Sequence, residues 1–466
     1  MTCPTIPGQS CPRADCLGLH DPGVCDHLAR LFAWRKTDAA GRGDGFRPRV
    51  DPADSRLRVG LWAPCCEPGG AETWQQQFAR SVDPAKVAWA GLVVVSGSVN
   101  AALAAAYDGI MPVGRGRPAA TRLAASCDVD VIVSWAIDDI PGLLSAIPPG
   151  ERPMVISVVH APIESDWGQH YYRQPEGIDR WVAVSELARD AIPAASLKGR
   201  PVDVIWNAVD AERLAPKRSR AEVRASWGVP ADAPVAGFLQ RFTTEKDPLA
   251  AVRLAASLPE PWHVVIVGDG PMMADLRQAK ADGSLDRLIL PGVDLDAGGV
   301  LSAFDTLIVP SAYESFGLTI AEGLWAGLPV ISARVGIARL VPGLTREIPI
   351  GASGEVIAAA VLADAADARG TAERITRARS FARERLNQAR FGRAWTDLLC
   401  SAALPRPGSI APAVRDAVLT CPDRGSVLPV SLQPSCGCGE LTECREGKGK
   451  VPGRVTLREC LDCRAT

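Results

Sequence analysis

The sequence predicts an α/β protein with two lobes. Short apolar segments of strand length alternate with helical segments, from residues 57–62 to residues 330–332. Such alternation is typical of parallel sheets covered by helices. The length of 466 residues adds a further argument, because it suggests two or three domains rather than one.

The composition is that of an ordinary globular protein and argues against several classes. Hydrophobic residues make up 47% and charged residues 22% of the chain, which allows a core of normal size. The formal net charge of −2 argues against nucleic-acid binding through overall charge, and no apolar run reaches the length of a spanning helix. Residues 1–20 lack the basic start and apolar segment of a secretory signal, so we expect a cytoplasmic enzyme.

Most of the 14 cysteines lie near the two ends of the chain. If the protein is cytoplasmic, clustered thiolates indicate metal ligands more than disulfides. The C-terminal spacing fits a structural zinc ion, and a reduced, disordered tail is the alternative. The candidate zinc ligands are Cys436, Cys438, Cys444, Cys460 and Cys463.

Shifts in composition separate both ends of the chain from its middle. Residues 1–55 form a Cys-containing extension with a linker, residues 401–420 a proline-containing linker, and residues 421–466 a Cys-rich tail. Between them, residues 56–206 and residues 207–400 contain the alternating strands and helices, and we expect one domain in each.

In the first domain, the expected strands cover residues 57–62, 87–95, 129–135, 154–159, 181–186 and 202–206. Gly69 and Gly70 lie between the first strand and a helix that begins near residue 71, where backbone can approach a phosphate or a sugar. Taken alone, this glycine pair would be a generic loop. His160 directly follows a strand, at the edge where open α/β sheets bind ligands, although a lone histidine more often has a structural role.

In the second domain, strands are expected at residues 235–239, 263–267, 288–293, 306–309 and 330–332, with helices at residues 300–304 and 371–400. Arg241 and Lys246 follow the first of these strands. A bidentate guanidinium and an ammonium at this position can both reach a diphosphate, and a solvated basic pair is the alternative.

The stretch over residues 310–330 carries the clearest signal. A polar loop leads into a helix that should begin near Phe316 or Gly317 and end before residue 327. The N–H groups of Gly317 and Leu318 are then free to hold an anion. Glu314 in the loop and Glu322 in the helix can accept hydrogen bonds from hydroxyl groups beside that anion. The alternative is a solvated loop residue and a charge on the helix surface.

Together these motifs resemble the retaining GT-B glycosyltransferases, most closely glycosyltransferase family 4. The pattern Pro-Ser-x-x-Glu-x-Phe-Gly-Leu-x-x-x-Glu over residues 310–322 carries the resemblance, supported by Gly-Gly-x-Glu at residues 69–72. The chain departs from the family at Ala208 and Gln240, where glycine is usual. The resemblance spans about residues 56–399 and implies two Rossmann-like domains facing across a cleft, flanked here by small Cys-rich termini. Residues 56–206 would bind the acceptor and residues 207–400 the donor, with a final helix that crosses back.

The resemblance also implies an activity. A sugar would pass from a UDP-, GDP- or ADP-sugar to an unknown glycan, lipid or protein acceptor, with retention at the anomeric carbon and no cofactor or obligatory metal. The implied catalytic residues are His160, Arg241, Lys246 and Glu314. The implied donor-binding residues are Gly69, Gly70, Val293, Phe316, Gly317, Leu318 and Glu322.

Two other functions fit the same scaffold. One is a non-catalytic protein that binds a sugar nucleotide or a glycan, which the intact charged residues disfavour. The other is a non-hydrolysing epimerase, which should show a second carboxylate-rich catalytic cleft that the sequence lacks. We expect no nucleic-acid partner, and the sequence leaves peripheral membrane association and oligomeric state open.

Overall fold

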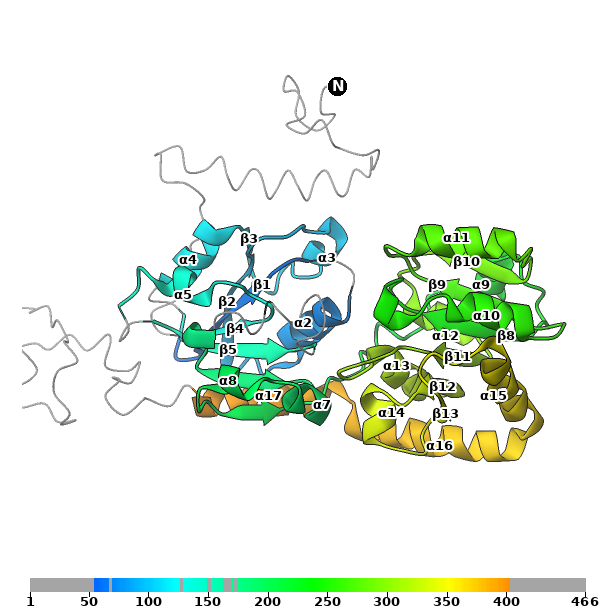
Figure 1. Cartoon of the computed structure of the whole chain (residues 1–466). Coiled ribbons are helices and arrows are strands. Elements are labelled where there is room, and N and C mark those ends of the chain that lie inside the picture. The colour runs from blue at the N-terminus through cyan, green and yellow to red at the C-terminus, as the bar shows by residue number, and fades with distance from the viewer. Residues whose placement is uncertain are drawn as a thin grey trace, which may run out of the picture.

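The computed structural model describes residues 54–66, 69–125, 129–148, 152–161, 170 and 175–402. The expected Cys-rich tail with its zinc candidates, the extension up to residue 53 and the linker from residue 403 onward lie outside the described residues. Within the described part, the chain forms two α/β lobes that lie side by side (Figure 1).

The first lobe is built on a parallel sheet of seven strands in the order β3-β2-β1-β4-β5-β6-β7. The strands are β1 (Leu57–Ala63), β2 (Val87–Val94), β3 (Val113–Arg115), β4 (Val131–Ser134), β5 (Met154–Val159), β6 (Arg180–Ala183) and β7 (Val202–Val204). The strand order reverses between β1 and β4, and open sheets bind ligands at the carboxyl ends of strands beside such a reversal.

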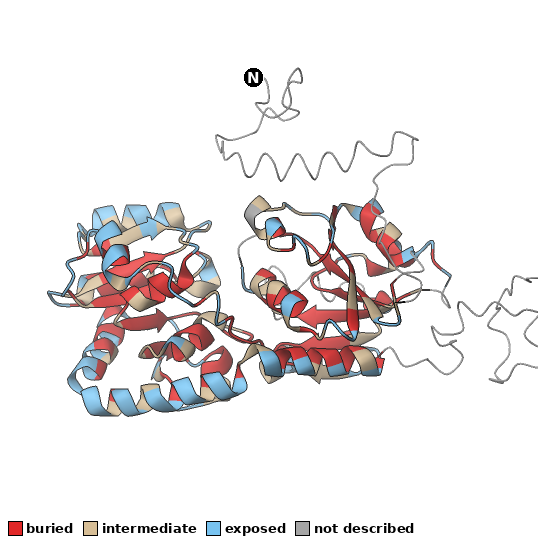
Figure 2. Ribbon diagram, turned by 180° about the vertical axis from the view of Figure 1, so that it is seen from behind, coloured by how far each residue is buried: buried red, intermediate tan, exposed pale blue. Residues whose placement is uncertain are grey.

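Helices and one 3₁₀ turn connect these strands. They are α2 (Gly70–Ser81), α3 (Ala101–Ala105), α4 (Arg117–Ala125), α5 (Ile140–Leu144), η1 (Pro175–Gly177), α7 (Glu186–Asp190) and α8 (Ala194–Leu197). Buried residues concentrate on the strands and on the helix faces that cover them (Figure 2). Val59, Leu61 and Trp62 of β1, for example, are almost fully buried, as expected for a strand with helices on both faces.

The second lobe is built on a parallel sheet of six strands in the order β10-β9-β8-β11-β12-β13. The strands are β8 (Val235–Leu239), β9 (His263–Val267), β10 (Leu288–Gly292), β11 (Thr306–Val309), β12 (Val330–Ala333) and β13 (Arg346–Ile348). The helices are α9 (Arg220–Ser226), η2 (Thr244–Lys246), α10 (Ala250–Ser257), α11 (Met273–Asp282), α12 (Ala297–Ala303), α13 (Leu318–Ala326), α14 (Gly336–Leu340), α15 (Gly354–Ala366) and α16 (Ala368–Arg385).

The chain passes between the lobes twice, and the two connecting segments are joined by backbone contacts. After β7, the N–H of Val209 donates a hydrogen bond of 2.7 Å to the carbonyl of Leu386, and Val209 forms an isolated parallel bridge with Asn387. Ala208 lies in the first passage and is not among the described non-glycine residues with positive φ, so replacing the usual glycine costs no strain there.

The second passage leads into α17 (Gln388–Ala402), which packs on α2 of the first lobe. Figure 1 shows α17 in orange among the elements of that lobe. Trp395 is fully buried, with its ring 5.6 Å from Trp74 and 4.6 Å from Phe78 between centroids. Gly392 lies so close to α2 that an added Cβ would sit 1.9 Å from the carbonyl oxygen of Ser81. Large aromatic contacts and a glycine at the closest approach therefore hold α17 against the first lobe.

The fold class is confirmed as α/β with two parallel-sheet domains. The strands expected at residues 154–159, 235–239, 263–267 and 306–309 match in both bounds. The helical structure expected over residues 371–400 is confirmed, and it divides into two helices, because α16 ends at Arg385 and α17 begins at Gln388 and runs on to Ala402. The break between α16 and α17 lies where the chain passes from the second lobe to the first. A straight helix could not make this change of direction.

Other elements differ from the sequence-based expectation at their ends. Strands β3 and β13 were not expected. Each has three residues and lies at a sheet edge, where few residues are buried, so the sequence shows no clear apolar run. Helix α12 begins at Ala297 rather than at residue 300, because Asp296 caps it by accepting a hydrogen bond from the N–H of Gly299. No helix in the described ranges combines the length and the apolar character needed to cross a membrane.

Candidate functional site

The loops after β8 and β11 lie next to each other at the carboxyl edge of the second sheet. The N–H of Ala312 donates to the carbonyl of Glu245 at 2.7 Å, and Thr319 Oγ1 of α13 donates to the carbonyl of Leu239 at 3.3 Å. These bonds bring together two segments that are about 70 residues apart in the sequence. The structure thereby places the two cationic candidates and the two acidic candidates around one loop pair.

Lys246 and Glu314 form an ion pair at this edge, with 2.7 Å between Nζ and Oε1. Ser311 Oγ also donates to Glu314 Oε1, at 2.9 Å. The side chains of Lys246 and Glu314 are 25% and 13% exposed, so the pair is held in place but still reachable. An anion can thus contact the ammonium while a hydroxyl group reaches the second carboxylate oxygen.

Arg241 and Gln240 complete the loop after β8. The guanidinium of Arg241 is exposed and makes no hydrogen bond or ion pair with any other described residue. Gln240, which replaces the glycine usual in the family, closes the loop because its Nε2 donates to the carbonyl of Lys246 at 3.1 Å. The departure from the family pattern therefore supports the loop that carries both cations.

Helix α13 begins one residue later than the sequence indicates, at Leu318, with Gly317 as its N-cap. Gly317 has φ of +81°, a left-handed conformation that favours glycine, and no side chain caps the first turn. The preceding loop is fixed by two backbone bonds, from the N–H of Gly336 to Glu314 and from that of Ile337 to Phe316. The uncapped N–H groups of the first turn, together with the helix dipole, can hold an anion.

Glu322 lies one turn into α13 and is 4% exposed. It accepts a hydrogen bond and ion pair from Arg213, a residue that the sequence analysis missed. The charge of Glu322 is the main cause that raises the pKa of Arg213 above the usual value. The only signal in the sequence is that Arg213 follows the Asn-Ala-Val-Asp segment closely, and no spacing rule joins residues 109 positions apart.

The first lobe touches the second at the start of α13. An added Cβ on Gly70 would lie 3.5 Å from Leu318 Cδ1, and Ser185 Oγ donates a hydrogen bond to the carbonyl of Ser315. Gly69 is the N-cap of α2, where an added Cβ would lie 2.5 Å from Glu72 Oε2. Gly70 therefore lies close to the start of α13, whereas Gly69 lies close to Glu72 of its own helix.

His160 follows β5 and lies against two tryptophans. Its ring centroid is 4.9 Å from that of Trp74 and 5.9 Å from that of Trp135, both with edge-to-face geometry. Nε2 is buried and has no hydrogen-bond partner among the described residues, although the residue as a whole is partly exposed. Burial lowers the pKa of His160 to about 3, so the imidazole is neutral at physiological pH. A neutral imidazole can exchange hydrogen bonds with a ligand but cannot supply a positive charge.

The two remaining donor-site candidates differ in exposure. The ring of Phe316 is 2% exposed and packs on Trp206 with 6.1 Å between centroids, so only its backbone is available to a ligand. Val293 follows β10 and is 56% exposed. Its side chain can therefore contact a flat ligand group at the carboxyl edge of the sheet.

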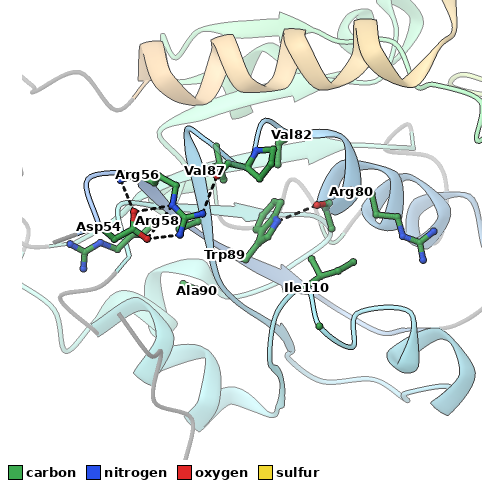
Figure 3. Close-up of a pocket in the computed structure, with 13 residues that line it drawn as sticks. Asp54, Arg56, Arg58, Arg80, Val82, Val87, Trp89, Ala90 and Ile110 are labelled. Atoms are coloured by element: carbon green, nitrogen blue, oxygen red, sulfur yellow. Dashed lines mark hydrogen bonds and ion pairs between the residues drawn. The ribbon is translucent and has the colours of Figure 1, made fainter. Parts of the chain in front are cut away.

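A separate cavity lies at the amino ends of β1 and β2. It measures about 540 Å³, and its lining includes Arg56, Arg58, Arg80 and Trp89. Figure 3 shows Trp89 between the paired Arg56 and Asp54 on one side and Arg80 on the other. Because ligands of open parallel sheets bind at the opposite, carboxyl edge, we assign the candidate site to the loop pair described above.

Two aspartates near β10 have structural partners. Asp294 pairs with Arg218 at 2.5 Å, and Asp296 accepts backbone hydrogen bonds from Lys217, Arg218 and Gly299. No cluster of three or more His, Cys, Asp or Glu side chains suited to a metal ion occurs in the part of the chain that the structure describes. Asp294 and Asp296 thus connect the start of α12 to the segment before α9.

Comparison with known proteins yields matches in sequence and in structure. Residues 233–378 match the model of the family described as glycosyl transferases group 1. A 2-deoxystreptamine glucosyltransferase of Streptomyces kanamyceticus is 33% identical over 160 residues, 31% of this chain and 41% of that protein. A D-inositol 3-phosphate glycosyltransferase of Saccharomonospora viridis is 37% identical over 172 residues, 33% of this chain and 38% of that protein. The chain therefore spans about two fifths of the length of these curated relatives.

Solved structures match over most of the chain. HepE of Anabaena in complex with UDP-glucose superposes with a TM-score of 0.63 at 19% identity, over 74% of this chain and 100% of that chain. Sucrose-phosphate synthase of Thermosynechococcus elongatus has a TM-score of 0.57 at 16% identity, over 74% of this chain and 99% of that chain. At such low identity, these matches show the fold alone, which is the GT-B architecture of two parallel-sheet domains.

Proposed function

We propose that this chain is a glycosyltransferase that takes its sugar from a nucleotide-diphosphate sugar. One observation carries the proposal: the Lys246–Glu314 ion pair lies beside the uncapped start of α13, within the 233–378 segment that matches the family. This arrangement offers positive charge to a diphosphate and a carboxylate oxygen to a neighbouring hydroxyl group.

The cations and the helix start would act on the leaving group. Transfer releases a nucleoside diphosphate, on which negative charge grows as the bond to the sugar breaks. Arg241, Lys246 and the N–H groups after Gly317 would stabilise that charge where it develops. A metal ion would not be required, since these groups already provide the charge compensation.

The remaining candidates would hold the rest of the donor. Glu314 would bind hydroxyl groups of the transferred sugar, Glu322 the ribose, and Val293 the base. His160 would exchange hydrogen bonds with the reacting sugar as a neutral imidazole. As the resemblance to the retaining enzymes implies, the leaving phosphate would take the proton of the acceptor, and the anomeric configuration would be kept.

Gly69 and Gly70 would let the backbone of the first lobe come close to the donor. Gly70 already lies against Leu318, so the diphosphate would bind where the two lobes meet. Closure of the lobes around the donor would exclude water and limit wasteful hydrolysis. The acceptor itself would be bound by the first lobe.

The test measures turnover by the purified full-length chain. UDP-, GDP- and ADP-sugars are supplied with and without acceptors, and release of nucleoside diphosphate is followed. The names of the curated relatives make 2-deoxystreptamine and D-inositol 3-phosphate the first acceptors to try. We expect slow hydrolysis of one donor without acceptor, unchanged turnover with EDTA, and a product with the donor's anomeric configuration by NMR. Tight binding of a nucleotide sugar without turnover for any acceptor class would favour the non-catalytic alternative.

A further inference from the structure

An ion pair ties the start of the second lobe to α13. Arg213 lies three residues after Asp210, next to the first passage between the lobes, and its guanidinium binds Glu322 Oε1. The side chain of Arg213 is 34% exposed and that of Glu322 is 5% exposed. The pair thus lies at the boundary of the core, with its carboxylate inside.

The backbone before Arg213 is held rigidly. Asp210 Oδ1 accepts hydrogen bonds from the N–H groups of Glu212, at 3.0 Å, and of Arg213, at 3.1 Å. The carbonyl of Asp210 also accepts from the N–H of Leu214. Asp210 is itself 6% exposed, so this turn directs Arg213 toward α13 in one orientation.

Only one oxygen of Glu322 is used. Arg213 is its single hydrogen-bond partner among the described residues, and the bond is to Oε1. Oε2 accepts no hydrogen bond from that part of the chain. When one oxygen of a carboxylate is paired with a cation, the second oxygen remains available to a hydroxyl donor.

We propose that Arg213 is the positioning residue of the ribose subsite: it fixes the rotamer of Glu322 so that Oε2 faces the ribose hydroxyl groups. This inference rests on the proposed function, because it needs a nucleotide donor. Arg213 acts through Glu322 rather than on the ligand. Without the guanidinium, the nearly buried carboxylate of Glu322 would lose the partner that holds its rotamer, and it would then bind hydroxyl groups less well.

The test compares ribonucleotides with their 2′-deoxy forms. Binding of UDP, GDP, ADP and the three 2′-deoxynucleoside diphosphates is measured by calorimetry for the full-length chain. The variants are Arg213→Ala, Arg213→Lys and the control Arg346→Ala. Arg346, at the amino end of β13, forms a similar ion pair with Asp364, with side chains 30% and 4% exposed, and Asp364 also pairs with Arg374.

We expect the wild type to bind its preferred ribonucleotide about tenfold or more tightly than the 2′-deoxy form. Arg213→Ala should reduce this ratio to near one by weakening ribonucleotide binding, while affinity for the 2′-deoxy form changes less than about threefold. Arg213→Lys, which restores the charge but not the forked geometry, should give an intermediate ratio. Arg346→Ala should keep the wild-type ratio. With a nucleotide sugar that the enzyme uses as donor, Arg213→Ala should raise KM for that donor and change kcat less than about threefold.

The outcomes separate the two proposals. If the wild type binds none of the six nucleotides, the proposed function fails, whatever the variants do. If the wild type discriminates and folded Arg213→Ala discriminates equally, the inference about Arg213 is wrong. If Arg346→Ala loses discrimination to the same extent, the effect is general destabilisation and the inference is again wrong. Should Arg213→Ala not fold, Arg213→Lys decides: an unchanged ratio there overturns the inference.

Discussion

Lys246 and Glu314 show what single residues contribute to the candidate site. Each was identified from its position after a strand, and the structure pairs them at 2.7 Å although 68 residues separate them in the chain. Parallel strands place their carboxyl ends at one edge, so both loops were expected at the same edge, but the sequence did not predict that β8 and β11 are neighbours in the sheet. Their proposed roles differ, because the ammonium would face the diphosphate and the carboxylate the sugar.

Replacing Lys246 by alanine should remove activity without unfolding the protein. We expect kcat/KM for the donor to fall by about 100-fold or more, because one charge that stabilises the leaving group is lost. The melting temperature should change little, since the side chain is 25% exposed. Lys198→Ala serves as a control, because Lys198 makes a surface pair with Glu176 at 3.7 Å. Full activity of the Lys246 variant would contradict its proposed role.

His160 should make stability depend on pH. Burial lowers its pKa from 6.5 to about 3, so between these values the unfolded chain binds a proton that the folded chain excludes. Stability should therefore fall as the pH falls through this window, by at most about 2 kcal/mol between pH 7 and pH 5. Urea unfolding of the wild type and of His160→Asn at both pH values measures this difference. Equal losses for both proteins would show that the imidazole is not excluded from water.

Arg213 marks the limit of sequence analysis for single residues. Glu322 was identified from the spacing of the motif over residues 310–322, but its partner lies in another segment. Helix and strand periodicity predict which residues share an element, and they do not predict which side chains meet between elements. The same limit applies to Ser185, whose hydroxyl reaches the carbonyl of Ser315 from the other lobe.

At the scale of elements, the loop before α13 is the part that the sequence described best. Glycine and proline after the helix predicted its end, and α13 does end at Ala326 before the left-handed Gly327. The start was less well defined, because Gly317 acts as the cap rather than as the first helical residue. Caps depend on backbone dihedrals, which the sequence restricts but does not determine.

Gly336 should be more sensitive to substitution than Gly351, another glycine with positive φ. Its φ is +48°, and an added Cβ would lie 2.4 Å from the carbonyl oxygen of Phe316. Gly351 has φ of +69° with open space around it, so Gly351→Ala should cost only about 1 kcal/mol, from backbone conformation. We expect Gly336→Ala to cost clearly more in urea unfolding and to weaken nucleotide binding, because the shifted loop carries Glu314. An equal loss of unfolding free energy in the two variants would contradict the close contact between Gly336 and the carbonyl of Phe316.

At the scale of the whole molecule, α17 connects the lobes through packing. Its buried face includes Phe391, Trp395 and Leu399, and it lies on α2, whose N-cap is part of the candidate site. Resemblance to known enzymes suggested a helix that crosses back, but the contacts that hold it could not be predicted. They depend on the shape of α2 and on the absence of a side chain at Gly392.

Trp395→Ala should loosen the connection between the lobes. Truncating a fully buried tryptophan costs about 3–5 kcal/mol. We expect calorimetry to resolve separate unfolding of the two lobes and small-angle scattering to give a larger radius of gyration. Arg393→Ala, on the exposed face of the same helix, should leave both measurements unchanged. A single cooperative transition for the Trp395 variant, at the wild-type radius, would contradict this role of α17.

The pairing of Val209 with Leu386 and Asn387 has a topological consequence. The second lobe is one uninterrupted segment inserted between two pieces of the first, and its two junctions are neighbours in space. Such a segment can be excised from its host and its ends joined by a short linker without stretching the fold. The second lobe could then be exchanged between scaffolds as one unit, while the first lobe keeps α17.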